Sequence, residues 1–227
     1  MQSKDRTFQV VAIVGLIVGV MALTIGFAAF TTSLTISSAA DVTPAATTLD
    51  VVFSTSSSSA VTGTVAGVAT GETGATAGSA TLANTTVSGI NAHFTKPGQT
   101  VTYTFYVYND SAYTAHLTGI TFGNASGEST FKACQAKTGS ANPATNDITT
   151  ACNGITLTLT VDGYETTTSK TSSEVAAYTG NKTIAASTGK TVTVVVTYAA
   201  GSAVPDGDIE VAFGDIQLNY SSVAPSA

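Results

Sequence analysis

The chain has 227 residues, a formal net charge of −6 and a charged fraction of only 10 %. It lacks a cluster of Lys and Arg, and this excludes the basic surface that nucleic-acid binding needs. The composition is rich in Thr, Ser, Ala, Gly and Val, and the β-branched residues among these favour strands over helices.

The first thirty residues contain a long apolar run. Lys4 and Arg6 precede an uncharged stretch from Phe8 to Phe30. As a helix this stretch would reach about 34 Å, enough to cross a bilayer, and the positive charges before it would hold its start in the cytoplasm. Small residues near its end also fit a signal-peptidase site. Residues 1–30 are therefore predicted to be a hydrophobic helix, either a cleaved signal peptide or a transmembrane anchor, and both export the remainder.

Residues 31–48 are predicted to be a short strand followed by a linker. The strand, 33–37, carries Leu34 and Ile36 on one face and hydroxyl residues on the other. A second short strand is expected at 49–54, LDVVFS, which contains Leu49, Val51 and Phe53. The tract 55–79 has one charge and no aromatic residue, so it is either a mobile loop or a set of edge strands with very small side chains.

From residue 80 onward the sequence predicts a succession of strands. Apolar residues alternate with polar ones over 100–109, 155–161 and 192–198, and turn residues separate these segments. A long strand over 209–220 is expected to break near Gly214 and Asp215. The only helix-like stretch after residue 30 is 129–136. Residues 49–227 are therefore predicted to form one all-β domain, an antiparallel β-sandwich of the jelly-roll or immunoglobulin-like kind.

The two cysteines are expected to form a disulfide. Cys134 and Cys152 are the only cysteines of the chain, and export would place them where thiols are oxidised. Closing the polar loop between them would stabilise the fold by roughly 3 kcal/mol in the chain-entropy model.

The sequence contains no recognisable catalytic or metal-binding motif. His93 and His116 lie far apart in strand-like segments and form no zinc spacing. Asp206 and Asp208 flank a glycine, a pattern that fits a turn better than a calcium site. We therefore expect no enzymatic activity, no bound metal and no cofactor.

The chain also holds sequons of the N-x-[ST] type, which are candidate glycosylation sites in an exported protein. Their asparagines are Asn84, Asn109, Asn124, Asn181 and Asn219.

Parts of the sequence resemble the camelysin and TasA-like group of exported prokaryotic proteins. The resemblance lies in ALTIGFAAFTTSLTISSAADV at the end of the apolar run, in FTKPGQTVTYTFYVYNDSAYTAHLTGI, and in GDIQLNY near the end of the chain. It covers less than half of the chain. It implies an extracellular jelly-roll subunit of biofilm or surface fibres, a homopolymer in which an N-terminal strand of one subunit completes a sheet of the next.

The residues that the resemblance points to as the donor strand are Leu34 and Ile36, with Leu49, Val51 and Phe53 as a second candidate. Either segment could instead pair within its own subunit. Two other classes stay open: a type IV pilin-like subunit, whose apolar helix would pack in the filament core, and a monomeric, membrane-anchored surface adhesin or binding module.

Overall fold

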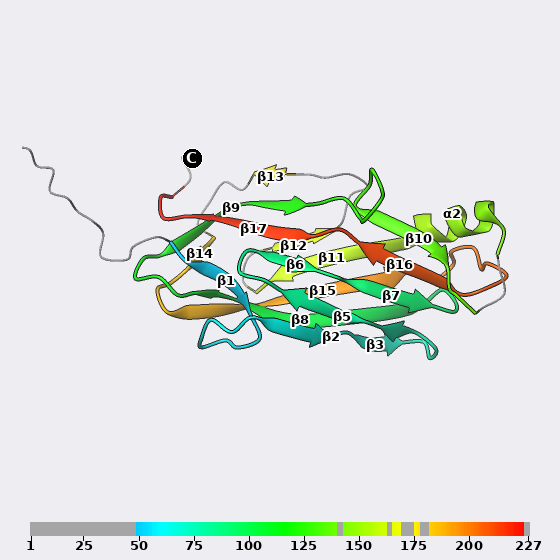
Figure 1. The fold of residues 1–227 in the computed structure, drawn as a ribbon, viewed down its shortest axis with the longest axis horizontal. Coiled ribbons are helices and arrows are strands. Elements are labelled where there is room, and N and C mark those ends of the chain that lie inside the picture. Colours follow the sequence, from blue (N-terminus) through cyan, green and yellow to red (C-terminus); the bar gives the residue numbers. More distant parts are fainter. Residues whose placement is uncertain (1–48, 140–142, 163–164, 169–174, 178–181, 225–227) are drawn as a thin grey trace, which may run out of the picture. The chain divides into compact units, whose positions relative to one another are not determined.

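The computed structural model describes residues 49–139, 143–162, 165–168, 175–177 and 182–224 (Figure 1). The expected apolar helix at 1–30, the segment with Leu34 and Ile36, and the sequon at Asn181 lie outside the described residues. Within the described part of the chain, no helix is long and apolar enough to cross a membrane.

The described residues form an all-β, sandwich-like fold in which each strand pair is antiparallel. Sheet A has six strands: β1 (Val51–Ser54), β3 (Val68–Gly71), β8 (Gln99–Asn109), β11 (Ile155–Val161), β12 (Glu165–Thr168) and β15 (Thr188–Tyr198). Sheet B has seven: β2 (Gly63–Ala66), β5 (Ser79–Leu82), β6 (Thr86–Ser88), β9 (Ala115–Phe122), β13 (Val175–Ala177), β14 (Thr183–Ile184) and β17 (Ile216–Ser221). Sheet C has four: β4 (Thr76–Ala77), β7 (Asn91–Phe94), β10 (Lys132–Ala136) and β16 (Ile209–Phe213).

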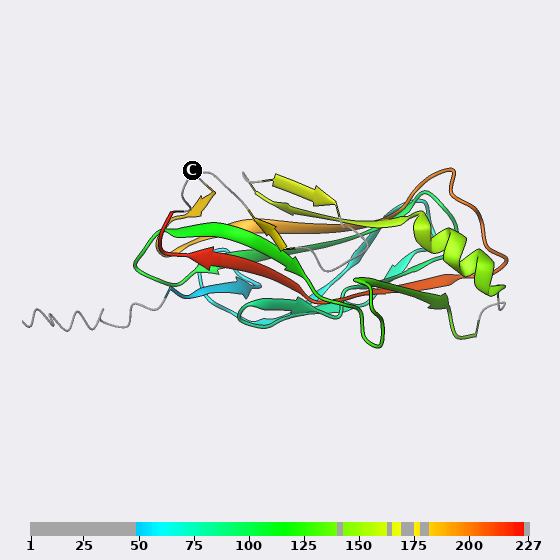
Figure 2. The ribbon, with the colours of Figure 1, turned by 90° about the horizontal axis from the view of Figure 1, so that it is seen from above.

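The strand order places the two longest strands, β8 and β15, side by side within sheet A. In sheet A the order is β1-β8-β15-β11-β12, with β3 beside β8 as well, and in sheet B it is β13-β9-β17-β6-β5-β2, with β14 also beside β9. Sheet C follows the order β10-β16-β7-β4. Figure 2 shows that β15, in orange, and β17, in red, run in different layers.

The predicted alternation is confirmed in the central strands. The apolar residues of β8, β11 and β15 are buried, and the threonines between them are on the opposite face, half-buried or exposed. These side chains join one hydrophobic core with residues of sheets B and C. Within it, Phe53 meets Phe105 edge-on at 5.6 Å between ring centroids, and Phe131 contacts both Phe122 and Phe213.

The prediction of a helix at 129–136 is wrong. Residues 132–136 are β10, which pairs with β16 over its whole length, and Phe131 just before it is fully buried. The pairing with a neighbouring strand outweighs a short local helix preference. The helix lies further on, at α2 (Thr145–Asn153), and ends at Gly154, whose N–H donates to the carbonyl oxygens of Ala151 and Cys152.

The tract 55–79 contains short strands. This favours the interpretation as edge strands with small side chains over the interpretation as a mobile loop. Residues 63–66 form β2 in sheet B and residues 68–71 form β3 in sheet A, so one stretch of chain passes from one sheet to the other. Gly67 stands at the crossing, where a Cβ atom would lie 2.7 Å from the ring of Tyr103. A glycine is needed here because the backbone approaches this ring so closely.

The predicted break at Gly214 and Asp215 is confirmed, since β16 belongs to sheet C and β17 to sheet B. A Cβ atom on Gly214 would clash with the carbonyl oxygen of Gly123. The last strand therefore starts afresh at Ile216 and runs along β9.

Candidate functional site

The edge of β17 that faces β6 is only partly covered. β6 pairs with β17 at two positions, Val87 with Ile216 and Thr86 with Gln217. On its other side β17 pairs with β9 as far as Ser221. Among the described residues, no strand lies beside Leu218 and Asn219 on the β6 side.

A tight turn explains why β6 cannot cover more of this edge. Ala83 and Thr86 exchange backbone hydrogen bonds, N–H of Ala83 to O of Thr86 at 2.9 Å and the reverse at 3.4 Å, so the chain reverses through Asn84 and Thr85. The carbonyl oxygen of Asn84 accepts a hydrogen bond of 2.8 Å from N–H of Phe53, which holds the turn against β1. β6 therefore begins only at Thr86.

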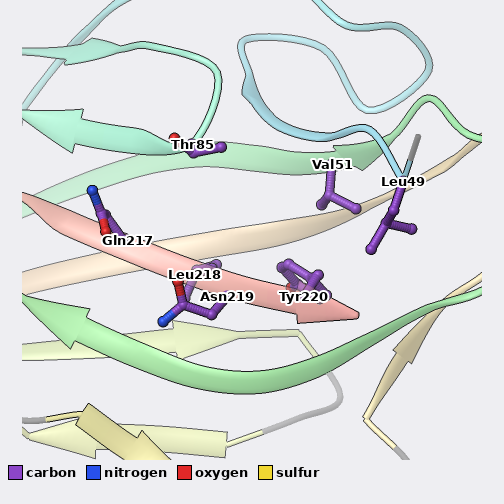
Figure 3. Close-up of a pocket in the computed structure, with 7 residues that line it drawn as sticks. All are labelled: Leu49, Val51, Thr85, Gln217, Leu218, Asn219 and Tyr220. Carbon is purple, nitrogen blue, oxygen red and sulfur yellow. The ribbon is translucent and has the colours of Figure 1, made fainter. Parts of the chain in front are cut away.

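A groove lies between this edge and β1 (Figure 3). Its volume is about 300 Å³. In Figure 3, Val51 projects from β1 toward the side of β17 that carries Tyr220, Leu49 does so from two residues before the strand, and Thr85 lies at the far end. Three of its lining side chains are aliphatic and one is aromatic; the lining residues are Leu49, Val51, Thr85, Gln217, Leu218, Asn219 and Tyr220.

The second predicted donor segment forms one wall of this groove. Residues 51–54 pair with β8 of the same chain, with Val51 opposite Asn109 and Phe53 opposite Val107. Phe53 is 2 % exposed and belongs to the core. Val51 and Phe53 therefore pair within their own subunit, and Leu49, which precedes the strand, packs against the core of the same chain.

Outside the groove, polar side chains link neighbouring elements through hydrogen bonds. Nε2 of His93 lies 3.1 Å from Oδ2 of Asp208, and Nδ1 of His93 lies 3.1 Å from Oγ1 of Thr76. This chain of contacts ties β4, β7 and the segment before β16 together. Nδ1 of His116 is buried without a hydrogen-bond partner among the described residues. In the same part of the chain, His, Cys, Asp and Glu form no group of three or more that could hold a metal ion.

The predicted disulfide between Cys134 and Cys152 is present, with a Cα–Cα distance of 5.9 Å. It joins β10 to the last turn of α2. Beside it, Nζ of Lys132 donates to the carbonyl oxygens of Cys152 at 2.6 Å and Ile155 at 2.7 Å. Burial lowers the pKa of Lys132, because its ammonium group is partly removed from water.

The asparagines of the sequons differ in their surroundings. Asn84 and Asn124 are exposed, and Asn219 is half-buried in β17, where its Nδ2 donates to Oγ1 of Thr121. Asn109 is 0 % exposed, and both ends of its side chain are hydrogen-bonded. Glycosylation of Asn109 in the folded chain is therefore excluded, which corrects that candidate.

Most residues of the groove were not singled out by the sequence. Gln217 and Leu218 lie in the segment GDIQLNY, to which the sequence assigned no site, and Thr85 was named only as the middle residue of a sequon. A further signal was the break at Gly214 and Asp215, which makes β17 a separate strand with its own neighbours.

The fold and the groove define an all-β protein with antiparallel, sandwich-like sheets, an internal disulfide and a partly open sheet edge. Comparisons of the chain with protein-family models, with curated proteins and with solved structures give no match.

Proposed function

We propose that this chain is a structural subunit of extracellular surface or biofilm filaments, assembled when an extended segment of one copy enters the groove of the next. The observation that carries the proposal is the edge of β17 at Leu218 and Asn219, where no described strand lies on the β6 side, with a groove beside it that Leu49, Val51 and Tyr220 help to line. The disulfide supports a location in an oxidising, extracellular compartment.

The physics of strand addition fits this groove. A strand laid along β17 would gain backbone hydrogen bonds and would continue the line that β6 leaves at Thr86. Alternate side chains of such a strand point to one side and recur about every 6.8 Å. Leu34 and Ile36 have this spacing, and burying each would contribute roughly 1.5–3 kcal/mol.

The connection between donor and groove is long enough for a polymer. The chain enters the described structure at Leu49, which itself lines the groove. Residues 38–48 would span at most about 40 Å when extended, enough to carry the donor segment away from its own subunit. A contact that joins the front of one copy to the back of the next, and does not close on itself, produces a filament.

The proposal also covers the finer topology, the cellular location and the question of catalysis. The finer topology is a jelly-roll or immunoglobulin-like sandwich, supported by connections such as β8 to β9 and β15 to β16, which cross between sheets. The similarity to camelysin and TasA-like proteins leads to the same role at a prokaryotic cell surface. We propose no enzymatic activity and no cofactor for this chain.

The test uses the full chain, exported by a prokaryotic host, with negative-stain electron microscopy of the surface material and mass spectrometry of the mature N-terminus. The informative variant places two charges on the apolar face of the donor segment, Leu34→Asp with Ile36→Asp. Its matched control, Ser33→Asp with Thr35→Asp, places the same charges on the polar face. Filaments are expected from the parent and the control, and monomers from the variant.

Other results would assign the chain to another class. Membrane-bound monomers that retain residues 8–30 would refute the filament and indicate an anchored adhesin or binding module. Filaments whose subunits keep this apolar run, and which form equally well from the Leu34→Asp and Ile36→Asp variant, would refute strand insertion and indicate a pilin-like assembly.

A further inference from the structure

A regular array of threonines covers the outer face of sheet A. In each of the three central strands, β8, β15 and β11, every second residue is buried and the residue between points outward. The strand registers place threonines opposite one another: Thr100 faces Thr197, which faces Thr156, and Thr104 faces Thr193. We call the outward-facing residues of these three strands the threonine face.

The threonine face continues onto β3. Thr70 lies opposite Thr100 in the register, and their Oγ1 atoms are 2.5 Å apart. Oγ1 of Thr100 also donates to the carbonyl oxygen of Thr70 at 2.9 Å. Val68 lies opposite Thr102 and is 60 % exposed.

We propose that the threonine face is a lateral contact between copies of this chain, through which neighbouring filaments adhere side by side. The inference rests on the filament function proposed above. Its outward residues over 100–104, 156–160 and 191–197 are threonine and valine, with no charged side chain. Because the chain has a net charge of −6, copies repel one another least where the surface carries no charge.

The side chains of this face keep the entropic cost of association low. Threonine and valine are β-branched and hold few rotamers, so pressing two such faces together immobilises little side-chain freedom. Valines such as Val195, which lies between Thr102 and Thr158 in the register, add apolar contact.

The area of the threonine face determines whether it can hold two isolated copies together or only copies within filaments. Three strands that contribute about 20 Å each and β3, which contributes about 13 Å, lie about 4.8 Å apart and give roughly 350 Å² per copy. Two such faces bury less than the 1,200 Å² or so of a standard specific interface, so two isolated copies would associate only transiently. In a filament the face recurs at every subunit, and many weak contacts act together.

The experiment compares two double variants of the full exported chain. Thr102→Glu with Thr193→Glu charges the centre of the threonine face. Thr64→Glu with Thr81→Glu adds the same charge at exposed, paired threonines of sheet B. Far-ultraviolet circular dichroism and the thermal midpoint check that each variant is folded. Bundling is measured by electron microscopy and by the fraction that pellets at low centrifugal force.

The parent and the sheet B control are expected to form bundles, and the threonine-face variant single filaments with at least a tenfold smaller pelleted fraction. Bundles from the threonine-face variant equal to those of the parent, or single filaments from the parent, would overturn the lateral contact and leave the filament function standing. A parent that forms no filament at all would refute the proposed function and this inference together.

Discussion

Replacing Asn109 with alanine is expected to be among the most destabilising changes of a polar residue in this chain. Nδ2 of Asn109 donates to the carbonyl oxygens of Tyr113 at 2.6 Å, Ile184 at 3.0 Å and Ala185 at 3.2 Å. Oδ1 accepts from N–H of Ser111 at 3.1 Å and from its hydroxyl at 2.6 Å. One side chain thus holds the turn after β8 against the end of β14.

The magnitude follows from what each partner loses. The hydroxyl of Ser111 keeps its bond to the carbonyl oxygen of Tyr113, and Ala185 is exposed and can be hydrated. The carbonyl oxygen of Ile184 is left buried without this donor, which costs about 1–3 kcal/mol, and the other lost bonds add roughly 1 kcal/mol or less each. We expect Asn109→Ala to lower the free energy of unfolding by about 3–4 kcal/mol.

Urea denaturation followed by circular dichroism measures this loss. For a slope near 2 kcal/mol/M the midpoint should fall by about 1.5–2 M. Asn84→Ala is the matched control, since Asn84 is also a sequon asparagine but is exposed, and alanine retains the carbonyl oxygen that Phe53 binds. Its effect should stay within about 0.5 kcal/mol. A loss below about 1 kcal/mol for Asn109→Ala would show that this network does not stabilise the fold.

Three further predictions concern stability. Removing the disulfide with Cys134→Ala and Cys152→Ala, which frees a loop with a sequence separation of 18, should cost about 3 kcal/mol in the same denaturation assay; an unchanged midpoint would contradict this. Gly67→Ala should lower the thermal midpoint by several degrees because its Cβ would lie 2.7 Å from the Tyr103 ring, whereas Gly63→Ala, whose nearest contact is 3.4 Å, should change it little. Burial raises the pKa of Tyr103, so the folded state retains this proton longer than the unfolded state; stability is then fully present below the ordinary tyrosine pKa of about 10 and is lost as the pH rises above it. Thermal midpoints between pH 9 and 11 should fall less in Tyr103→Phe than in the parent, and equal slopes would refute that assignment.

The sequence predicted the elements whose pattern is local. The alternation around Tyr103 and along 155–161 and 192–198 gave strands with the expected buried faces, and the lone pair of cysteines gave the disulfide. Each of these features is set by side-chain period or by residue count, both of which can be read without knowing the neighbours.

Features that depend on non-local partners were not predictable in this way. Residues 132–136 have a weak local helix pattern, yet β16 supplies a pairing strand from a distant part of the chain. The groove beside Leu218 exists because a turn at Asn84 ends one strand early, and no single motif encodes that absence. The sequon at Asn109 likewise matches the N-x-[ST] pattern, but the burial of Asn109 depends on the assembled fold.

The stretch 63–71 has a consequence for how the folded chain opens. β2 is hydrogen-bonded in sheet B and β3 in sheet A, and only Gly67 separates them. If either strand detaches from its sheet, it therefore loosens the other. Partial unfolding is usually confined to contiguous units that separate from the rest. Here the shared strand couples the two sheets, so slow amide hydrogen exchange should extend across both at similar rates. A protease would then find few half-opened molecules to cut.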